Sequence, residues 1–528
     1  MGRAMNGYHD QLRLIRALRH PQCYPHAAKN IRVIETHISW VVLAGPFAYK
    51  IKKAVNLGFL DYTTLAARKH YCAEEIRLNR RTAPDLYLDV VAIGGALDAP
   101  RFGSVPAFEY AVRMKRFGAA DLLDGLLARG KVLPRHIDAL AASLADFHAR
   151  LPSVPVDSVY GTAGSIGRIA QQNIEQLRPL LHATADGQTL AALARATETE
   201  FAACAEIFAA RRTQGFVREC HGDLHLGNIA LIDDVPVPFD GIEFDPALRW
   251  IDVMDEIAFA MMDLLYRGHP AYAWRLLNAY LEITGDYAGI AVLRAYLAYR
   301  ATVRAKVSAI RAGQAGTSRH TQQTEMASCR DHLTLAQRCL DDRHPALIIT
   351  HGLPGSGKTT FAQYLIEQMG AVRIRSDVER KRLHGLQASE RSRGDIYNAA
   401  ATGQTYARLY QLAREMLQAG YVVIVDAAFL QYAERGQFRN LARELAVPFA
   451  IASLHAADSA LRRRLRRRRG DASEADVAVL EKLQAVQQPV APEEHARMAR
   501  FTTAQAPDSR DNARAWRKLA SMLTVSVA

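Results

Sequence analysis

The chain has 528 residues, which is more than one hydrophobic core usually supports, so we expect two or more domains. Its apolar fraction of 49% is ordinary for a globular protein, and acids interrupt its longest apolar stretches, which excludes membrane spans. The net charge of +13 favours anionic ligands such as nucleotides, phosphorylated metabolites or nucleic acid. No apolar leader with a cleavage site opens the chain, so a cytoplasmic location is expected.

The six cysteines are scattered along the chain, and no two of them form a C-x-x-C pair. Neither a zinc site nor a disulfide framework is therefore expected.

The first third of the chain predicts a small α+β lobe, and the following third is mostly helical. Hydrophobic periodicity predicts helices over residues 9–20 and 64–81, and strands over 31–36, 38–43, 47–55, 86–93 and 108–117. Further helices follow after residue 119 and dominate residues 166–210.

The third of these strands carries two lysines, Lys50 and Lys52, which alternation places on one face. In a kinase, a lysine on such a strand contacts the nucleotide phosphates and is steadied by a helix glutamate. Lys50 with Glu75 is the favoured pair, and Lys52 is the alternative to Lys50.

Residues 221–228 read H-G-D-L-H-L-G-N, and Asp240 ends the next apolar run. Asp223 and Asn228, five positions apart on one tight loop, can face a common point, where Asp223 accepts a hydroxyl proton and Asn228 holds Mg²⁺. Asp240 is the second expected metal ligand, with Glu243 and Asp245 as alternatives. Acids on the following helix, Asp252 and Asp255, are expected to hold the loop backbone.

The H-G-D-x-x-x-x-N motif with a following Asp resembles the aminoglycoside phosphotransferase and choline kinase branch of the protein-kinase-like superfamily. The resemblance implies a bilobal fold, with Asp223 as catalytic base, Asn228 and Asp240 on Mg²⁺, and Lys50 on the ATP phosphates. One departure from protein kinases is that residues 36–40 stand where a G-x-G-x-x-G loop would be.

Residues 313–323 read as an exposed polar loop between two long helices, and residues 341–345 mark a domain boundary. A short apolar run, 346–350, then leads into Gly352-Leu353-Pro354-Gly355-Ser356-Gly357-Lys358-Thr359-Thr360. Strand, glycine-rich loop and helix in this order form a Walker A motif. Its backbone amides close around phosphate, Lys358 reaches the β and γ oxygens, and the Thr359 hydroxyl can bind Mg²⁺.

Two further strands of this region end in acids. A strand over 371–374 delivers Asp377, placed to accept a proton from an acceptor hydroxyl, with Arg380 one helical turn later to hold substrate or phosphate. Helix capping is the alternative role of Asp377. A buried run over 421–426 ends in Asp426 and has the Walker B pattern, in which Asp426 binds Mg²⁺ directly or through water.

Seven arginines lie within the eight residues Arg462–Arg469, followed by Gly470, Asp471, Ala472 and Ser473. Most of them are expected to form a solvated helix face, while Arg464 and Arg467 are the candidates for contact with the transferring phosphate. The segment resembles the lid of small P-loop kinases.

Residues 344–528 resemble the small-molecule and polynucleotide 5′-hydroxyl kinases among P-loop proteins, including the gluconate kinase and zeta toxin groups. That resemblance implies Asp377 as acceptor base and Arg380 as its partner. Domain order and motifs together resemble bacterial proteins described as bifunctional aminoglycoside phosphotransferase-like and ATP-binding proteins. We therefore expect an α+β bilobal kinase-like domain over 1–340 and an α/β P-loop kinase domain with a parallel sheet over 341–528.

The sequence thus predicts an ATP- and Mg²⁺-dependent phosphotransferase with two centres that act on hydroxyl groups of small molecules. A nucleic-acid 5′-hydroxyl kinase is less favoured, because few aromatic residues accompany the arginines. A regulatory or toxin-like kinase acting on a protein or nucleotide-sugar is the third hypothesis. No membrane partner is expected, and the acceptor is not identified by any motif.

Overall fold

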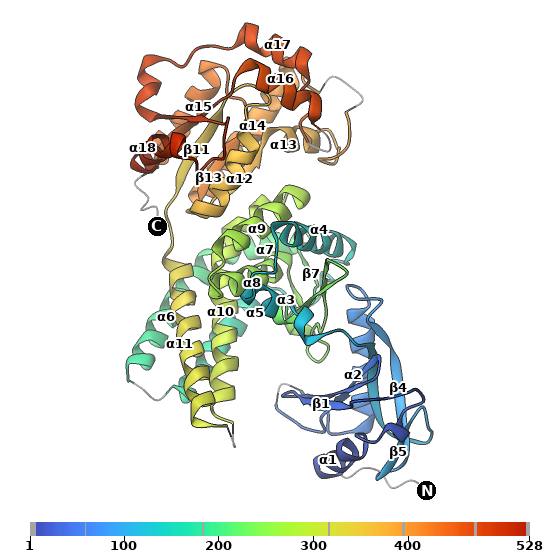
Figure 1. Ribbon diagram of the computed structural model, residues 1–528. Helices are drawn as coiled ribbons and strands as arrows, with labels where there is room; N and C mark the ends of the chain where they lie inside the picture. The colour runs from blue at the N-terminus through green and yellow to red at the C-terminus, as the bar shows by residue number, and fades with distance from the viewer. Residues whose placement is uncertain are drawn as a thin grey trace. The chain divides into compact units, whose positions relative to one another are not determined.

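The computed structural model describes residues 7–58, 60–181, 184–314, 317–392, 396–468 and 472–523. The chain divides into two compact units, and Figure 1 shows the ribbon of both. The first comprises Met1–Ile166 and Phe208–Ala260, and the second comprises Gly167–Ile207 and Met261–Ala528.

A six-stranded antiparallel sheet forms the core of the first unit, with strand order β1-β2-β3-β6-β4-β5. Its strands are β1 (Arg32–Glu35), β2 (Ser39–Ala44), β3 (Phe47–Lys52), β4 (Tyr87–Ala96), β5 (Ala99–Phe102) and β6 (Ala107–Lys115). Helix α1 (Tyr8–Ala17) buries Leu14 and Ile15 in the cluster that contains Trp40, while α2 (Leu65–Asn79) packs against β4 and β6. Both helices and all strands except β5 lie where hydrophobic periodicity predicts them.

Several further elements of the first unit lie around the loop of residues 221–228. They are α3 (Leu123–Ala128), α4 (Pro134–Arg150), β7 (Val217–Glu219), β8 (Ile229–Ile232), β9 (Val235–Pro238) and β10 (Trp250–Asp252). The hairpin of β8 and β9 follows residues 221–228 and returns the chain to Asp240, while β7 pairs with β10.

Helices make up the middle of the chain. They are α5 (Ala163–Leu177), α6 (Thr184–Ala203), α7 (Ala205–Thr213), α8 (Val253–Tyr266), α9 (Pro270–Thr284), α10 (Ile290–Ala312) and α11 (Arg319–Asp341). The long helices α10 and α11 pack against each other. The polar segment between them is shorter than predicted, because α11 already begins at Arg319, where the Ser318 side chain caps it; residues 315 and 316 lie outside the described residues.

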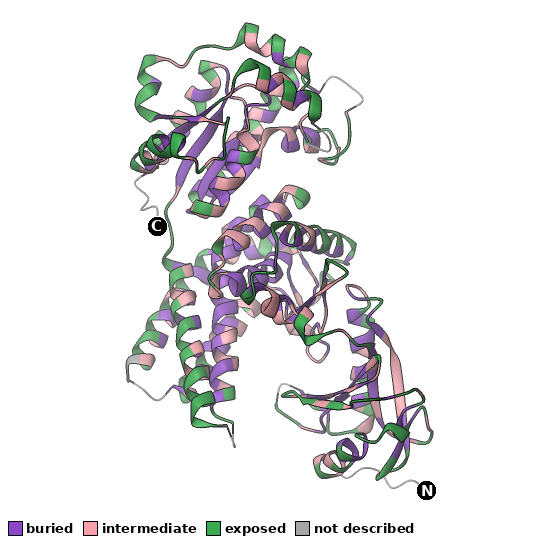
Figure 2. Cartoon of the chain, in the orientation of Figure 1, coloured by how far each residue is buried: buried purple, intermediate pink, exposed green. Residues whose placement is uncertain are grey.

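The C-terminal region folds around a sheet of five parallel strands in the order β12-β13-β11-β14-β15. Their bounds are β11 (Ala346–His351), β12 (Val372–Arg375), β13 (Val422–Asp426), β14 (Phe449–His455) and β15 (Met498–Thr502). The associated helices are α12 (Lys358–Met369), α13 (Ser376–Leu383), α14 (Ala399–Gln418), α15 (Tyr432–Glu444), α16 (Asp458–Arg467), α17 (Val477–Val486) and α18 (Ala513–Leu523). The central strands are fully buried, as Figure 2 shows, so their continuous apolar runs are those of a covered parallel sheet.

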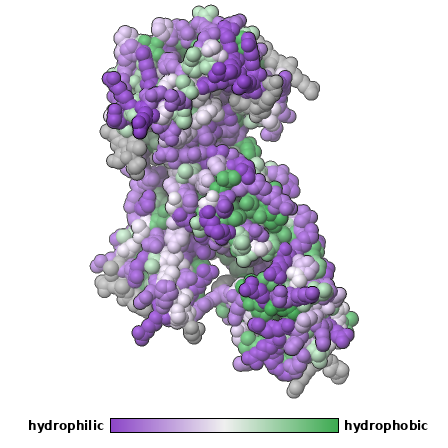
Figure 3. All heavy atoms as spheres, viewed as in Figure 1, coloured by the Kyte–Doolittle hydropathy of each residue, from purple (hydrophilic) through white to green (hydrophobic). Residues whose placement is uncertain are grey.

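Helices α12 and α18 share one hydrophobic cluster with the sheet, which includes Ile348, Phe361 and Leu519. Hydrophilic side chains cover most of the face shown in Figure 3. Among the described residues, the helices are all too short or too polar to cross a membrane.

Candidate active sites

The two strand lysines of the first unit converge on one helix carboxylate. Lys50 Nζ donates to Glu75 Oε1 at 2.8 Å, and Lys52 Nζ donates to Glu75 Oε2 at 2.7 Å. Alternation along β3 correctly predicted that both lysines share a face, and Glu75, which is fully buried, contacts the predicted Lys50 as well as the alternative Lys52. The two lysines differ in their second partners, because Lys50 also pairs with Asp240 and Lys52 also pairs with Glu243.

The electrostatics of this cluster favour the charged forms of Lys50, Lys52 and Glu75. Burial opposes the charge of Lys50, but the carboxylates of Asp240 and Glu75 outweigh it and raise the pKa of Lys50 well above its ordinary value. For Glu75, burial favours the neutral acid, yet the two lysines lower its pKa. Glu243 is a partner of Lys52 and accepts from the Tyr62 hydroxyl at 2.7 Å, so its carboxylate is already paired with these two side chains.

The loop brings Asp223, Asn228 and Asp240 together. Asn228 Nδ2 donates to Asp223 Oδ2 at 2.9 Å and to the Asp223 carbonyl at 3.0 Å. Across the hairpin, the backbone amide of Phe239 donates to the Asn228 carbonyl at 2.9 Å, which places Asp240 next to Asn228. Asp240 has a φ of 64°, and its amide donates to the Tyr87 hydroxyl at 3.0 Å. The Asn228 side-chain amide and the carboxylates of Asp223 and Asp240 thus lie on neighbouring segments, and such oxygen donors suit a hard divalent cation.

The start of the loop is held by Glu256 of α8. Its Oε1 accepts from the backbone amides of His221 at 2.6 Å and Gly222 at 2.9 Å, while His148 Nε2 contacts its Oε2 at 2.7 Å. The expectation that Asp252 holds this backbone is wrong, because Asp252 pairs with the buried Arg211. The sequence patterns did not single out Glu256. The one signal that could have indicated its role is that it is an acid on an apolar helix.

The remaining acids near the loop have local roles. Asp245 accepts from the backbone amide of Ala247 at 2.8 Å and caps a short helix. Cys220 is buried, which raises the pKa of its thiol well above the ordinary value. The described cysteines form no disulfide with one another, as their scattered spacing predicts.

The Walker A loop of the second unit has the backbone that its glycines permit. Gly355 has a φ of 80° and Gly357 a φ of 89°, both in the left-handed region. At Gly352 an added Cβ would lie 2.6 Å from the Leu454 carbonyl oxygen, so no larger residue fits there. Glycines at these positions therefore let the loop adopt this conformation and pack against β14.

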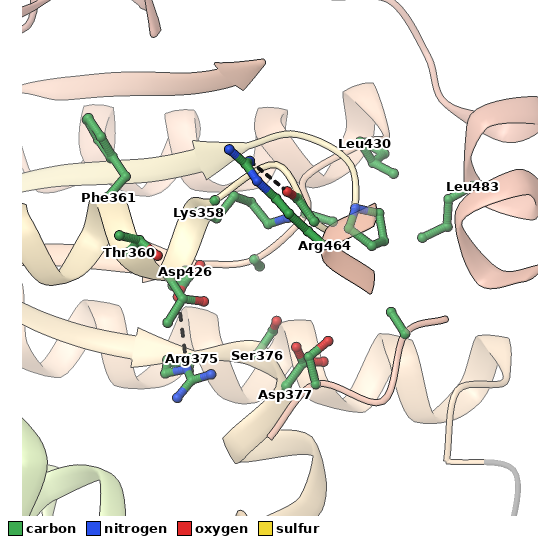
Figure 4. A pocket seen from close by; sticks show the side chains of 18 of the residues that line it. Lys358, Thr360, Phe361, Arg375, Ser376, Asp377, Asp426, Leu430, Arg464 and Leu483 are labelled. Atoms are coloured by element: carbon green, nitrogen blue, oxygen red, sulfur yellow. Dashed lines mark hydrogen bonds and ion pairs between the residues drawn. The ribbon is translucent and has the colours of Figure 1, made fainter. Parts of the chain in front are cut away.

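A cavity of about 820 Å³ opens in front of this loop (Figure 4). Among its lining residues are Lys358, Thr359, Thr360, Asp377, Arg380 and Asp426. Lys358 Nζ donates to the carbonyls of Gly352 at 2.9 Å and Leu353 at 3.0 Å, and burial lowers its pKa. The predicted phosphate lysine, both threonines and the three predicted polar residues thus share one cavity.

The surroundings of Asp426 suit a role as metal ligand. Its Oδ2 is buried and has no hydrogen-bond partner among the described residues. A buried carboxylate oxygen without a donor is costly, unless a cation or its water shell completes it. Thr359, which also lines the cavity, supplies a hydroxyl of the kind that accompanies such an acid.

Arg380 enters the cavity from α13, as Asp377 does. Its Nη1 donates to the Ile396 carbonyl at 3.0 Å and to Thr402 Oγ1 at 3.2 Å, and its guanidinium lies over the Tyr397 ring. The Nε atom is buried and lacks a partner within the described part of the chain. Asp377 is half-buried in the first turn of α13 and lines the cavity. The alternative that it caps this helix is wrong, because Arg375 is the N-cap residue and no side-chain hydrogen bond caps the helix.

Four arginines of the predicted lid line the same cavity, namely Arg463, Arg464, Arg467 and Arg468. Arg464 Nη1 donates to the Gly355 carbonyl and to Thr503 Oγ1, both at 3.0 Å, so it lies directly on the Walker A loop. Residues 469–471 of the predicted lid lie outside the described residues. The lid candidates therefore number four rather than the two that the sequence favoured, Arg464 and Arg467.

The two halves of the chain match different families. Residues 71–242 match the family described as "Phosphotransferase enzyme family", and residues 347–490 match the family described as "AAA domain". Uncharacterized proteins of Mycobacterium tuberculosis and Mycobacterium bovis are each 32% identical over 419 residues, which cover 78% of this chain and 81% of the relative.

Two solved structures each align with part of the chain. A choline/ethanolamine kinase family protein from Mesorhizobium loti is 12% identical and covers 62% of this chain and 99% of its own, with a TM-score of 0.37. A gluconokinase from Sinorhizobium meliloti is 21% identical and covers 34% of this chain and 93% of its own, with a TM-score of 0.24.

Proposed function

The chain belongs to the same family as its mycobacterial relatives, with a phosphotransferase region followed by a P-loop region, and from this premise we propose an ATP- and Mg²⁺-dependent kinase with two phosphotransfer centres. Each centre transfers the γ-phosphoryl group of ATP to a hydroxyl group of a small molecule. A cavity of about 820 Å³ beside Lys358 has the size of a site for a nucleotide and a small acceptor.

In the N-terminal centre, Asp223 takes the proton of the acceptor hydroxyl as the hydroxyl oxygen attacks the γ-phosphorus; the bond from the γ-phosphorus to the β–γ bridging oxygen breaks, and ADP leaves. Asn228 keeps Asp223 in place through the 2.9 Å hydrogen bond and, with Asp240, would hold Mg²⁺. Lys50, steadied by Glu75, contacts the nucleotide phosphates. When bound, Mg²⁺ neutralises charge on the β and γ oxygens.

In the C-terminal centre, the loop 352–360 surrounds the β-phosphate and Lys358 contacts the β and γ oxygens. Asp426 and Thr359 would hold Mg²⁺, and Asp377 accepts the acceptor's proton. Arg380 holds the acceptor, while Arg464 and the neighbouring Arg467 offset charge on the transferring group.

One observation supports this proposal most. Lys358, Asp377 and Asp426 line the same cavity, and the buried oxygen of Asp426 has no partner among the described residues. A phosphate-binding cation, a base and a metal ligand around one space are the set that phosphoryl transfer needs.

The proposal is tested by ATP consumption against a set of hydroxyl-bearing metabolites. Asp223→Ala is expected to abolish turnover with one group of acceptors and Asp377→Ala with another, while the double variant is inactive. Unchanged turnover in both single variants would refute the proposal.

A second candidate is a kinase of nucleic-acid 5′-hydroxyl ends, favoured by the four lid arginines at the cavity. Labelling of a 5′-hydroxyl oligonucleotide over a range of salt concentrations decides this point, and transfer that disappears in Asp377→Ala would support it.

A further inference from the structure

Helix α9 precedes the P-loop region by sixty residues, yet it contacts the edge strand of the parallel sheet within the second unit. Asn278 Nδ2 donates to the Ala371 carbonyl at 2.9 Å, and the Arg373 amide donates to Asn278 Oδ1 at 2.7 Å. The Asn278 side chain thus forms hydrogen bonds with backbone groups at the edge of β12, as a neighbouring strand would. The end of α9 is therefore fixed relative to β12.

One turn later on α9, Glu282 bridges two arginines of β12. Its Oε2 accepts from Arg373 Nη2 at 2.9 Å, and its Oε1 accepts from Arg375 Nη1 at 2.6 Å. The Glu282 carbonyl also accepts from Arg382 of α13, at 2.6 Å. The strand and the helix that deliver Asp377 are thus both attached to α9.

Arg375 lies between two carboxylates. While its Nη1 is bonded to Glu282, its Nε lies 4.0 Å from Asp426 Oδ2, the buried oxygen that has no hydrogen-bond partner among the described residues. Figure 4 shows Arg375 directed at Asp426 across the cavity lining. A guanidinium so close would normally donate to a buried carboxylate. Instead, its Nη1 donates to Glu282 at 2.6 Å.

We propose that Glu282 is a positioning residue of the C-terminal centre, which holds Arg375 back from Asp426 and so keeps that carboxylate open to Mg²⁺. The inference rests on the proposed role of Asp426 as metal ligand. It extends the centre beyond residues 347–490 to a helix outside the matched P-loop region. Replacing Glu282 by glutamine weakens its hold on Arg375, which then pairs with Asp426 and competes with the metal.

The experiment measures ADP affinity of the full chain by calorimetry, with Mg²⁺ and with EDTA. Lys358→Ala gives the binding that remains at the N-terminal centre. Glu282→Gln is expected to weaken the Mg²⁺-dependent affinity of the C-terminal centre roughly tenfold and to leave metal-free ADP binding unchanged. The double variant Glu282→Gln/Arg375→Gln is expected to regain Mg²⁺ dependence, because the competing guanidinium is gone.

The matched control is Glu367→Gln. Glu367 of α12 accepts from Arg275 of α9 at 2.8 Å, so this variant also loses an ion pair to α9 but does not touch Arg375. Its Mg²⁺ dependence is expected to equal that of the wild type.

The inference would be overturned if Glu282→Gln and Glu367→Gln lost equal ADP affinity, or if the loss in Glu282→Gln were the same with EDTA as with Mg²⁺. It would also be overturned if the double variant did not recover Mg²⁺-dependent ADP affinity. If instead Lys358→Ala leaves all ADP binding intact, the proposed C-terminal centre itself fails.

Discussion

Lys50 and Lys52 share Glu75, but their other partners suggest different roles. Lys50 also contacts Asp240 beside the loop, whereas Lys52 is fully buried against Glu243. We therefore propose that Lys50 makes the phosphate contact and that Lys52 has a structural role.

Lys50→Met is expected to raise the KM for ATP of the N-terminal centre by about tenfold or more, since a charge-assisted hydrogen bond contributes roughly 1.5–3 kcal/mol. The fold should persist, because Lys52 still neutralises Glu75 at 2.7 Å. Steady-state kinetics in an Asp377→Ala background measure this centre alone. Lys53→Met is the control, because Lys53 pairs with Glu35 at 2.6 Å on the opposite face of the sheet. An equal rise in the KM for ATP of the Lys53→Met variant would contradict the role of Lys50.

Glu256 links the stability of the loop to pH. Burial favours its neutral form, but the hydrogen bond and charge of His148, the charge of His221 and the loop amide of Gly222 lower its pKa from 4.5 to about 2. A folded-state pKa below the unfolded value adds stability that is complete above about pH 4.5 and is lost as pH falls toward about 2. The difference corresponds to roughly 3 kcal/mol.

Glu256→Gln is accordingly expected to lower the free energy of unfolding at pH 7, and its deficit relative to the wild type should shrink between pH 4.5 and 3. Urea denaturation at several pH values measures this. Asp146→Asn removes the exposed Asp146–Arg150 pair and should change little at any pH. A deficit independent of pH would show that the charge of Glu256 is not what stabilises the loop.

At the scale of elements, β12 depends on Asn278 for its outer edge. Asn278→Ala leaves the Ala371 carbonyl and the Arg373 amide without their partner, and each buried group then costs roughly 1–3 kcal/mol. Hydrogen exchange should become faster in residues 371–375 and remain slow in β14. Asn278→Asp keeps the acceptor and should have an intermediate effect. Unchanged exchange in residues 371–375 would show that α9 does not stabilise the edge.

The local spacing of residues in the sequence predicted most helices and strands of the chain. It is also enough to place Lys50 and Lys52 on one face of a strand and to recognise the Walker A motif in residues 352–360. The strands that it missed include β5, β14 and β15, none of which ends in a motif such as those that follow β11, β12 and β13. It also missed Glu256 and Glu282, whose partners lie 108 and 93 residues away in sequence. Such contacts depend on tertiary packing, which no local spacing specifies.

At the scale of the whole molecule, we propose that one polypeptide joins two unrelated solutions to phosphoryl transfer. The first unit contains a loop with Asp223, Asn228 and Asp240, and the second contains a Walker A loop on a parallel sheet. The sequence predicts a domain boundary near residue 340, while α9 contacts β12 from well before it. The working part of the C-terminal centre, as we propose it, therefore begins before the P-loop match.

The central claim is that the chain has two nucleotide-binding centres, and the stoichiometry of nucleotide binding tests it most directly. Calorimetric titration with Mg²⁺ and a non-hydrolysable ATP analogue is expected to give two sites per chain in the wild type. Lys358→Ala and Asp240→Ala are each expected to lose one site, and the double variant both. A single site per chain in the wild type, or one single variant that removes both sites, would contradict the account.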